Sequence, residues 1–415
     1  MHMNYFSFLK APLLLLVMTA VSVGAADWPQ WRGPARDGKV LDEKVPTTWP
    51  KALKQEWKVP VGLGHSSPVV ADQRIYVFAR QGEEEILRCL DAITGKELWH
   101  SGQPIAYLVN SAAIEHGKGP KSTPLVSRGN VYTYGITGVL SCHDAKTGKL
   151  KWRHEFAKQY PATSPLYGTA MSPLIEGDLI IAHVGGHDKG ALTAFDVETG
   201  TLKWSNDVDG PAYSSPIVAV LGGVKQIVTF TQQNLVGIEV ARGQLLWKMA
   251  AKSSYDTNSV TPVPYKDTLI VATEQQGLTA IRLEKSGAQL TPREVWSNKE
   301  VQLYLNTPVI QDNMLFGFSV LQRGQVFSIN ADTGQVVWRG PGRSGENAAI
   351  LNLAGKVLLV LTNEGNLFVQ PLTASGFAPI AQFTVASSPT WAHPVFLGDR
   401  ILVKDESTLA SFRIL

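Results

Sequence analysis

The chain has 415 residues, of which 38 are lysine or arginine and 35 are aspartate or glutamate. A formal net charge of +3 with 18% charged residues is close to balance, so no strong basic field favours nucleic acid or an anionic surface as a partner. The length allows two or three domains of ordinary size, unless one repeat accounts for the whole chain.

Residues 1–26 have the pattern of a signal peptide. Lys10 precedes an apolar run from Ala11 to Val23, and the small residues Gly24, Ala25 and Ala26 follow it. A run of about 13 apolar residues is short for a transmembrane helix, although a retained membrane anchor is the alternative. No cysteine follows the run, so we expect a periplasmic or secreted protein with no membrane span and no lipid anchor.

Residues 27–50 are rich in tryptophan, proline and glycine and have no alternating strand pattern. The stretch DWPQWRGPARDG, residues 27–38, contains Trp28 and Trp31. We expect both indole rings to fold back on the following domain as an apolar clasp, with glycine and proline permitting the turn. A partner-binding arm is the alternative.

A short pattern recurs five times with one spacing in the rest of the chain. An acidic or amide residue is followed four positions later by glycine, and tryptophan comes four positions after the glycine. The copies are DAITGKELW at Asp91–Trp99, DAKTGKLKW at Asp144–Trp152, DVETGTLKW at Asp196–Trp204, EVARGQLLW at Glu239–Trp247 and NADTGQVVW at Asn330–Trp338. Two degenerate copies end at Trp296 and Phe383, and Trp57 lacks the upstream half.

These eight aromatic residues lie 42 to 53 residues apart, which is the length of a four-stranded propeller blade. We expect each ring to dock between neighbouring blades and to stabilise the ring of blades. The series is Trp57, Trp99, Trp152, Trp204, Trp247, Trp296, Trp338 and Phe383.

Each period supplies four strands. The turn residues suit a hairpin closed by glycine in the left-handed conformation. Upstream of it, an apolar pair follows a proline step, such as SSPVV at Ser66 or STPLV at Ser122, and NAAIL at Asn347 replaces this step once. We predict an all-β, eight-bladed propeller over residues 51–415, in which the N-terminal strand at Trp57 pairs with the last blade and closes the ring.

The two cysteines, Cys89 and Cys142, occupy equivalent positions two residues before the turn acid. Other copies have small residues there, so we expect a packing role, with a disulfide or metal role as the alternative. His183 and His187 fall on a strand and its turn and lack further ligands, so no metal site is expected.

The repeated turn and tryptophan resemble the tryptophan-docking motif of PQQ-type β-propellers, the fold of the quinoprotein alcohol dehydrogenases and of the outer-membrane protein assembly factor BamB. The resemblance covers the chain after Trp49. WPQWRGPARDG, GHSSPVV at Gly64 and TWAHPVFLGDRILVKDE at Thr390 are similar to an exported subfamily of PQQ-binding-like propellers.

In such propellers, the connections from outer to inner strands surround the mouth of the central channel. The two connections after Trp99 and Trp152 are long, and we expect them to form a wall that holds His116 and His154 among other polar residues. We predict a ligand site of bulky polar groups at the mouth, formed by His65, Lys121, Tyr167, Tyr213, Tyr304, Arg343, Glu346 and His393. A surface role for each of them is the alternative.

Three functions remain open from the sequence. The first is a non-catalytic scaffold, similar to BamB, which binds an envelope or extracellular protein, acts as a monomer and needs no cofactor. The second is a quinoprotein oxidoreductase that uses PQQ and a divalent cation, although the adjacent cysteine pair of those enzymes is missing. The third is a protein that binds glycans or another polymer. No catalytic residue is identified, since HExxH, GxSxG, P-loop and CxxCH patterns do not occur.

Overall fold

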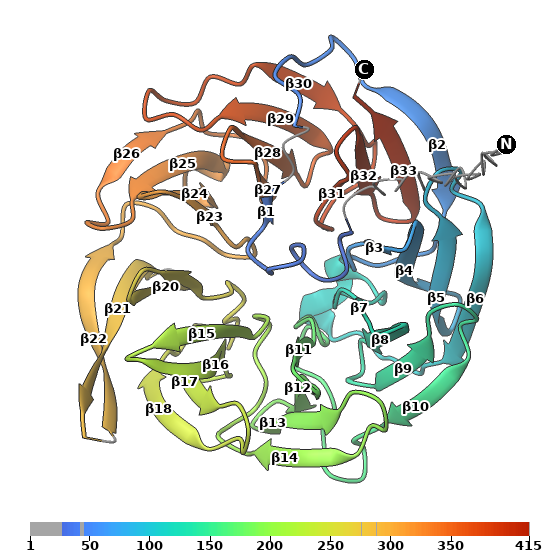
Figure 1. Ribbon diagram of the computed structural model, residues 1–415, viewed down its shortest axis with the longest axis vertical. Helices are drawn as coiled ribbons and strands as arrows, with labels where there is room; N and C mark the ends of the chain where they lie inside the picture. Colours follow the sequence, from blue (N-terminus) through green and yellow to red (C-terminus); the bar gives the residue numbers. More distant parts are fainter. Residues whose placement is uncertain (1–26, 42–44, 275, 288, 415) are drawn as a thin grey trace, which may run out of the picture.

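The computed structural model describes residues 27–41, 45–274, 276–287 and 289–414. These residues form eight sheets arranged as the blades of a ring (Figure 1), so the predicted all-β, eight-bladed propeller is confirmed. The predicted signal peptide lies outside the described residues. None of the helices in the described ranges is long and apolar enough to cross a membrane.

The first four blades follow one another along the chain. Blade one contains β3 (Val69–Ala71), β4 (Arg74–Gln81), β5 (Glu84–Asp91) and β6 (Glu97–Pro104). Blade two contains β7 (Leu125–Ser127), β8 (Asn130–Tyr134), β9 (Leu140–Asp144) and β10 (Leu150–His154). Blade three contains β11 (Leu174–Glu176), β12 (Leu179–Gly186), β13 (Lys189–Asp196) and β14 (Leu202–Asn206). Blade four contains β15 (Ile217–Leu221), β16 (Val224–Phe230), β17 (Asn234–Glu239) and β18 (Leu245–Ala250).

The remaining blades complete the ring. Blade five contains β19 (Val263–Tyr265), β20 (Thr268–Thr273), β21 (Gly277–Ser286) and β22 (Gln289–Asn298). Blade six contains β23 (Val309–Gln311), β24 (Met314–Ser319), β25 (Gln325–Asn330) and β26 (Val336–Arg339). Blade seven contains β27 (Ala348–Leu353), β28 (Val357–Thr362), β29 (Asn366–Pro371) and β30 (Ala381–Thr384). Blade eight contains β31 (Val395–Phe396), β32 (Arg400–Lys404), β33 (Thr408–Arg413) and β2 (Lys54–Pro60). Two 3-10 helices, η1 (Ser111–His116) and η2 (Leu321–Arg323), lie in loops.

The ring closes as the sequence predicts. β2 pairs antiparallel with β33, and Trp57 lies opposite Ser411. The outer strand of blade eight therefore comes from the start of the chain, while its three inner strands come from the end. This pairing holds the two ends of the ring together and leaves no unpaired strand between the first and the last blade.

The repeated acidic residue organises each tight turn. The Asp91 Oδ1 atom accepts hydrogen bonds from the backbone N–H groups of Ile93 and Thr94 and from the Thr94 hydroxyl, at 2.7 to 3.1 Å. Gly95 then adopts φ +70°, which a residue with a Cβ adopts at a cost. The turn brings β6 back along β5.

The indole rings lie across the boundaries between blades. A Cβ atom built on Gly95 of blade one would lie 2.7 Å from the ring of Trp57, and one built on Gly200 of blade three would lie 2.8 Å from the ring of Trp152. Five indole N–H groups also donate to a turn carbonyl of the following blade. The pairs are Trp57 with Ile93, Trp152 with Val197, Trp204 with Val240, Trp296 with Ala331 and Trp338 with Thr373.

Three members of the aromatic series make other contacts. The Trp99 ring lies against Gly148 of blade two, but its indole N–H has no acceptor in the described structure. The Trp247 indole N–H donates to the Gln226 side chain within its own blade, because blade five has a long hairpin in place of the short turn. Phe383 packs on Trp49 with ring centroids 6.4 Å apart. The contribution of the series to stability stays a prediction.

Residues 27–41 enter the central channel of the ring (Figure 1). Trp28 exchanges two backbone hydrogen bonds of 2.8 Å with Val70 of β3. After a loop through the channel, β1 (Lys39–Val40) pairs in parallel with β27 and becomes a fifth strand of blade seven. The segment thus contacts blade one and blade seven, which lie on either side of blade eight, where the ring closes.

A pair of glycine substitutions tests the indole contact. Gly177 and Gly200 both have positive φ, but a Cβ on Gly177 would have no atom within 4 Å, whereas a Cβ on Gly200 would meet Trp152. We expect Gly177→Ala to lower the free energy of unfolding by about 1–2 kcal/mol through backbone strain. Gly200→Ala should cost about 1–3 kcal/mol more, because the indole ring must move. Equal losses in denaturant titrations would show that the contact contributes nothing.

Candidate functional site

Two buried arginines fix the N-terminal segment inside the channel. Arg32 is 1% exposed, and its guanidinium donates to the carbonyls of Thr307 and Pro308 at the start of β23. Arg36 is 6% exposed and donates to the carbonyls of Ser172 and Pro173, at 3.0 and 2.8 Å, at the start of β11. Because these carbonyls belong to blades six and three, the segment spans the channel.

Both cations lie over one indole ring. The guanidinium carbons of Arg32 and Arg36 are each 5.5 Å from the centroid of Trp31, and His393 meets the same ring edge-on at 6.0 Å. Burial lowers the pKa of Arg32 to about 10 and that of Arg36 to about 9, so both remain charged at neutral pH. Trp31 is therefore held as the floor of a cavity at the channel mouth.

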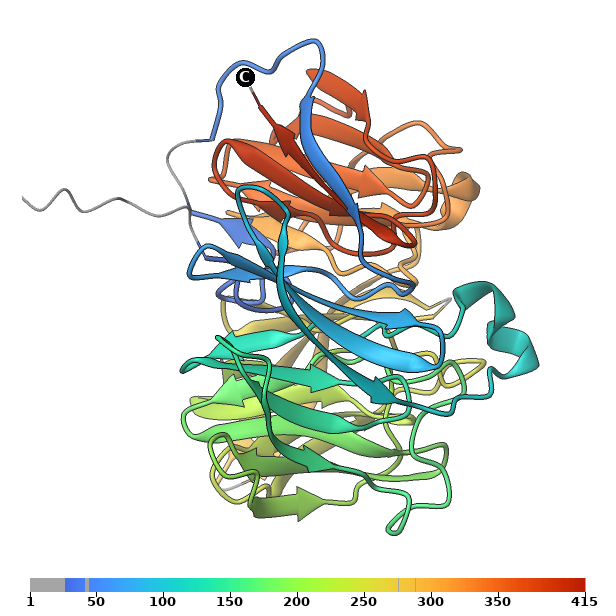
Figure 2. The ribbon, with the colours of Figure 1, turned by 90° about the vertical axis from the view of Figure 1, so that its right-hand side faces the viewer.

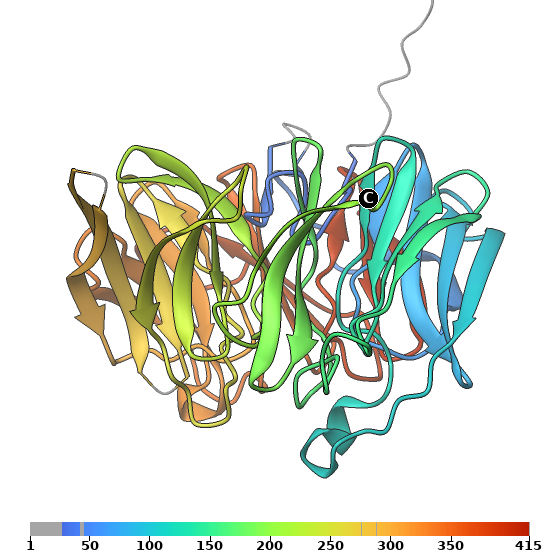
Figure 3. The ribbon, with the colours of Figure 1, turned by 90° about the horizontal axis from the view of Figure 1, so that it is seen from below.

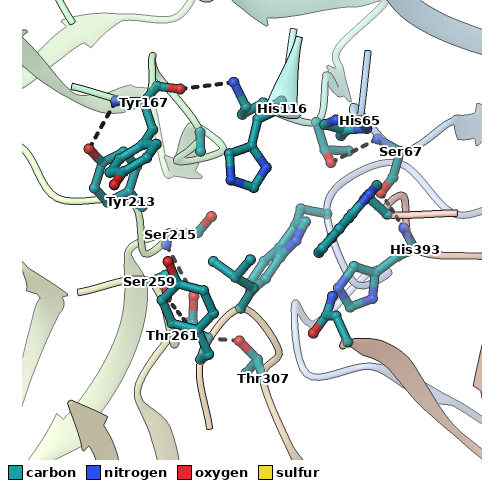
Figure 4. A pocket seen from close by; sticks show the side chains of 18 of the residues that line it. His65, Ser67, His116, Tyr167, Tyr213, Ser215, Ser259, Thr261, Thr307 and His393 are labelled. Atoms are coloured by element: carbon teal, nitrogen blue, oxygen red, sulfur yellow. Dashed lines mark hydrogen bonds between the residues drawn. The ribbon is translucent and has the colours of Figure 1, made fainter. Parts of the chain in front are cut away.

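The structure brings together six of the eight predicted site residues around this cavity (Figure 4). Each lies on a loop that leads from an outer strand to the inner strand of the next blade. They are His65, Lys121, Tyr167, Tyr213, Tyr304 and His393. That they bind a ligand stays a prediction.

Arg343 and Glu346 are exposed on the loop before β27 and do not line the cavity. His154, which we expected in the loop wall, is the last residue of β10 instead. Its ring stacks on Phe195 with centroids 4.7 Å apart, and its Nε2 atom lies 2.7 Å from the Gly200 carbonyl. The outer strand continues past Trp152 as far as His154, so this side chain packs between blades.

Trp31, Trp391 and Asn347 also line the cavity, and none of them was among the predicted site residues. The centroid of the Trp391 ring lies 6.0 Å from the centroid of the His65 ring and 6.0 Å from that of the His116 ring. The DWPQWRGPARDG stretch contained a usable signal, since it places Trp31 beside Arg32 in a segment with no strand pattern.

A belt of hydroxyl groups runs around most of the cavity below its rim. In each step, the backbone N–H of one strand-start residue donates to the side-chain hydroxyl of the equivalent residue in the next blade (Figure 4). The steps, at 2.8 to 3.3 Å, are His393 to Ser67, Ser67 to Thr123, Thr123 to Ser172, Ser172 to Ser215, Ser215 to Thr261 and Thr261 to Thr307. The small polar residues before the inner-strand prolines thus link blades.

Burial keeps the imidazoles of the site neutral. It lowers the pKa of His65 to about 3, with a further contribution from nearby Lys121, and it lowers the pKa of His393 to about 3, with a contribution from Arg32. The pKa of His116 is lowered as well, again mainly by burial. A neutral imidazole has one donor and one acceptor nitrogen.

Among the described residues that line the cavity, Lys121 is the only one with a formally charged side chain. Its ammonium group donates to the Tyr167 carbonyl at 2.8 Å, and burial lowers its pKa to about 8. The Tyr213 hydroxyl accepts a hydrogen bond from the Tyr167 backbone at 3.2 Å, and burial raises its pKa.

The cysteines and the histidine pair for which a disulfide or metal role was considered lie away from the cavity. Cys89 and Cys142 are free and buried in β5 and β9, where burial raises their pKa values to about 11 and about 12. The Nε2 atom of buried His183 lies 3.0 Å from the Asp209 carbonyl. In the described part of the chain, no three His, Cys, Asp or Glu side chains form a group that could hold a metal ion.

Comparison with known proteins decides the family. The family model for outer membrane protein assembly factor BamB matches residues 83–340, which is more than half of the chain. The chain belongs to the BamB family. BamB from Yersinia pestis is 23% identical over 375 residues, which cover 85% of this chain and 86% of that protein.

Solved structures show the same fold as this BamB-family propeller. BamB from Moraxella catarrhalis gives a TM-score of 0.59 at 14% identity and covers 88% of this chain and 98% of that one. A quinohemoprotein alcohol dehydrogenase from Pseudomonas putida gives a TM-score of 0.68 at 12% identity and covers 94% of this chain and 80% of that one.

The lining of this BamB-family channel does not fit PQQ with a divalent cation. PQQ carries three carboxylates, whereas the lining offers the single ammonium of Lys121, and Arg32 and Arg36 are bonded to backbone carbonyls. A divalent cation prefers carboxylate and carbonyl oxygens, and no aspartate or glutamate of the described chain lines the cavity. We therefore derive no redox step through this cofactor.

The neutral imidazoles predict a dependence of stability on pH. The pKa of His393 in the folded protein lies below its unfolded value near 6.5, so the unfolded state binds more protons. Its contribution to stability is full above about pH 6.5 and is lost as the pH falls from there towards 3, by about 1.4 kcal/mol per pH unit.

Lowering the pH from 7 to 5 should reduce the free energy of unfolding of both proteins. We expect this reduction to be about 2 kcal/mol smaller in His393→Gln than in the parent, because the variant has no imidazole at this position. Denaturant titrations at both pH values measure this difference. Parallel losses in the parent and the variant would contradict a buried, neutral imidazole.

Proposed function

We propose that this BamB-family propeller is a non-catalytic scaffold of the cell envelope, periplasmic or secreted, that binds a partner protein through the face of the channel mouth. BamB relatives are named as factors of outer membrane protein assembly, and their similarity extends over most of both chains. This similarity supports an envelope location and protein partners for this chain.

The observation that carries the proposal is an apolar, projecting loop at the mouth. The loop between β6 and β7 contains η1 and extends beyond the ring (Figures 2 and 3). Leu108 is 94% exposed and Ile114 is 66% exposed on it, and Tyr255 is 64% exposed on the connection between blades four and five. Exposed large apolar side chains gathered on one face are typical of a protein-interaction surface.

The loop is attached firmly at its base. The Pro120 carbonyl accepts the backbone N–H groups of His65 and Ser66 at 2.8 and 3.0 Å, and Asn110 caps the start of η1. The apolar side chains are therefore presented on an ordered support, which reduces the entropy lost on binding.

Affinity capture from envelope extract tests the proposal. We expect the double substitution Leu108→Ser and Ile114→Ser to reduce recovery of a bound protein at least 10-fold, because about 1.4 kcal/mol of binding free energy gives that factor. The matched control is Ile93→Ser, which removes an exposed isoleucine from a turn at the opposite end of a blade.

Recovery in the control should equal that of the parent. A partner retained equally by both variants, or no partner bound by the parent protein, would contradict binding through this loop. Thermal unfolding of each variant checks that the substitutions leave the fold intact.

A further inference from the structure

The mouth cavity has a rigid aromatic floor. Trp31 is half-buried, lies against two arginines that are bonded to blades six and three, and meets His393 edge-on. Because the guanidinium groups are fixed by backbone carbonyls, the indole ring does not need to be ordered when a ligand binds. A fixed aromatic surface suits a ligand with an apolar face.

The hydroxyl belt supplies hydrogen-bond donors above this floor. Each belt oxygen accepts one backbone N–H, so its position is set, whereas its own proton has no acceptor within the described part of the protein. Five belt hydroxyls line the cavity. They belong to Ser67, Thr123, Ser215, Thr261 and Thr307.

The belt is interrupted at blade seven, where acceptors replace donors. This blade has Asn347 in place of a hydroxyl residue before proline, and the hydrogen bonds run no further than Thr307. Asn347 is 7% exposed, and its Oδ1 atom has no hydrogen-bond partner in the described structure. The Nδ1 atom of His393 in the next blade has no hydrogen-bond partner there either, and it accepts or donates according to the tautomer. Both residues line the cavity, and a buried polar atom without a partner is costly.

The charges of the cavity exclude most ionic ligands. No carboxylate of the described residues lines it, and the ammonium group of Lys121 repels an organic cation. A multiply charged anion would meet one ammonium group, and that group is already bonded to the Tyr167 carbonyl. The ligand that matches is uncharged and carries both hydroxyl groups and an apolar face.

We propose that the channel mouth binds the end of a neutral carbohydrate, with the apolar face of a pyranose ring on the aromatic rings and its hydroxyl groups bonded to Asn347, His393 and the hydroxyl belt. Sugar hydroxyls both donate and accept, as this arrangement of fixed donors and unpaired acceptors requires. The CH groups on one side of a pyranose match the rings of Trp31 and Trp391. The proposal does not depend on the partner protein.

A glycan array that holds neutral and acidic oligosaccharides is the first measurement. We expect the mature chain to bind neutral glycans, and calorimetry with the neutral glycan of highest signal should give one site per chain. Asn347→Ala and Trp391→Ala should each weaken that affinity about 10-fold or more, since each removes about 1.4 kcal/mol of contact free energy. Trp391→Phe keeps an aromatic face and should retain more affinity than the alanine variant.

The loop variant Leu108→Ser with Ile114→Ser is the matched control, because neither residue lines the cavity. Glycan affinity should be unchanged in it, which separates this site from partner capture. The proposal is overturned if no glycan binds, if acidic glycans alone bind, or if Asn347→Ala and Trp391→Ala bind as the parent does while remaining folded. Saturable binding of PQQ with Ca²⁺ that displaces the glycan, measured by absorbance, would also overturn it.

Discussion

Pairing of β2 with β33 is the interaction on which the molecule depends. Most blades pack their outer tryptophan on the turn of the next blade, and such a series ends in two unsatisfied surfaces unless it closes. The strand around Trp57 removes both surfaces at once. It completes the sheet of blade eight, and its indole ring covers Gly95 of blade one. Closure turns contacts between neighbours into one ring with a central channel.

The same end of the chain then divides this channel. Charged guanidinium groups are rarely buried without counter-ions, yet Arg32 and Arg36 use inner-strand carbonyls as acceptors. These carbonyls are free to accept because, among the described residues, no further strand pairs with the inner edges of blades six and three. One cavity lies on the mouth side, above Trp31, and a second lies on the other side, lined by Arg32, Arg36 and residues of the inner strands.

The mouth face presents two kinds of surface that suit two kinds of ligand. The projecting loop is apolar and exposed at Leu108 and Ile114, whereas the cavity is aromatic, neutral and rich in hydroxyl groups. Because the loop and the cavity share the connection that carries His116 and Lys121, a protein bound to the loop would lie beside the cavity opening. The two proposals therefore concern adjacent but separable sites.

The sequence by itself determined the fold, the number of blades and the way in which the ring closes. The reason is local: an acidic residue, a glycine and a tryptophan at one spacing encode a turn and the ring packed against it, and counting such units gives the architecture. The sequence also indicated six lining residues, because loops between blades end at one face.

Tertiary structure alone decided the rest. Arg343 and Glu346 belong to the same set of loops but are exposed, and Trp31 is far from the other lining residues in sequence. The place of Trp31 depends on which backbone carbonyls Arg32 and Arg36 reach across the channel, and no local pattern specifies such long-range hydrogen bonds.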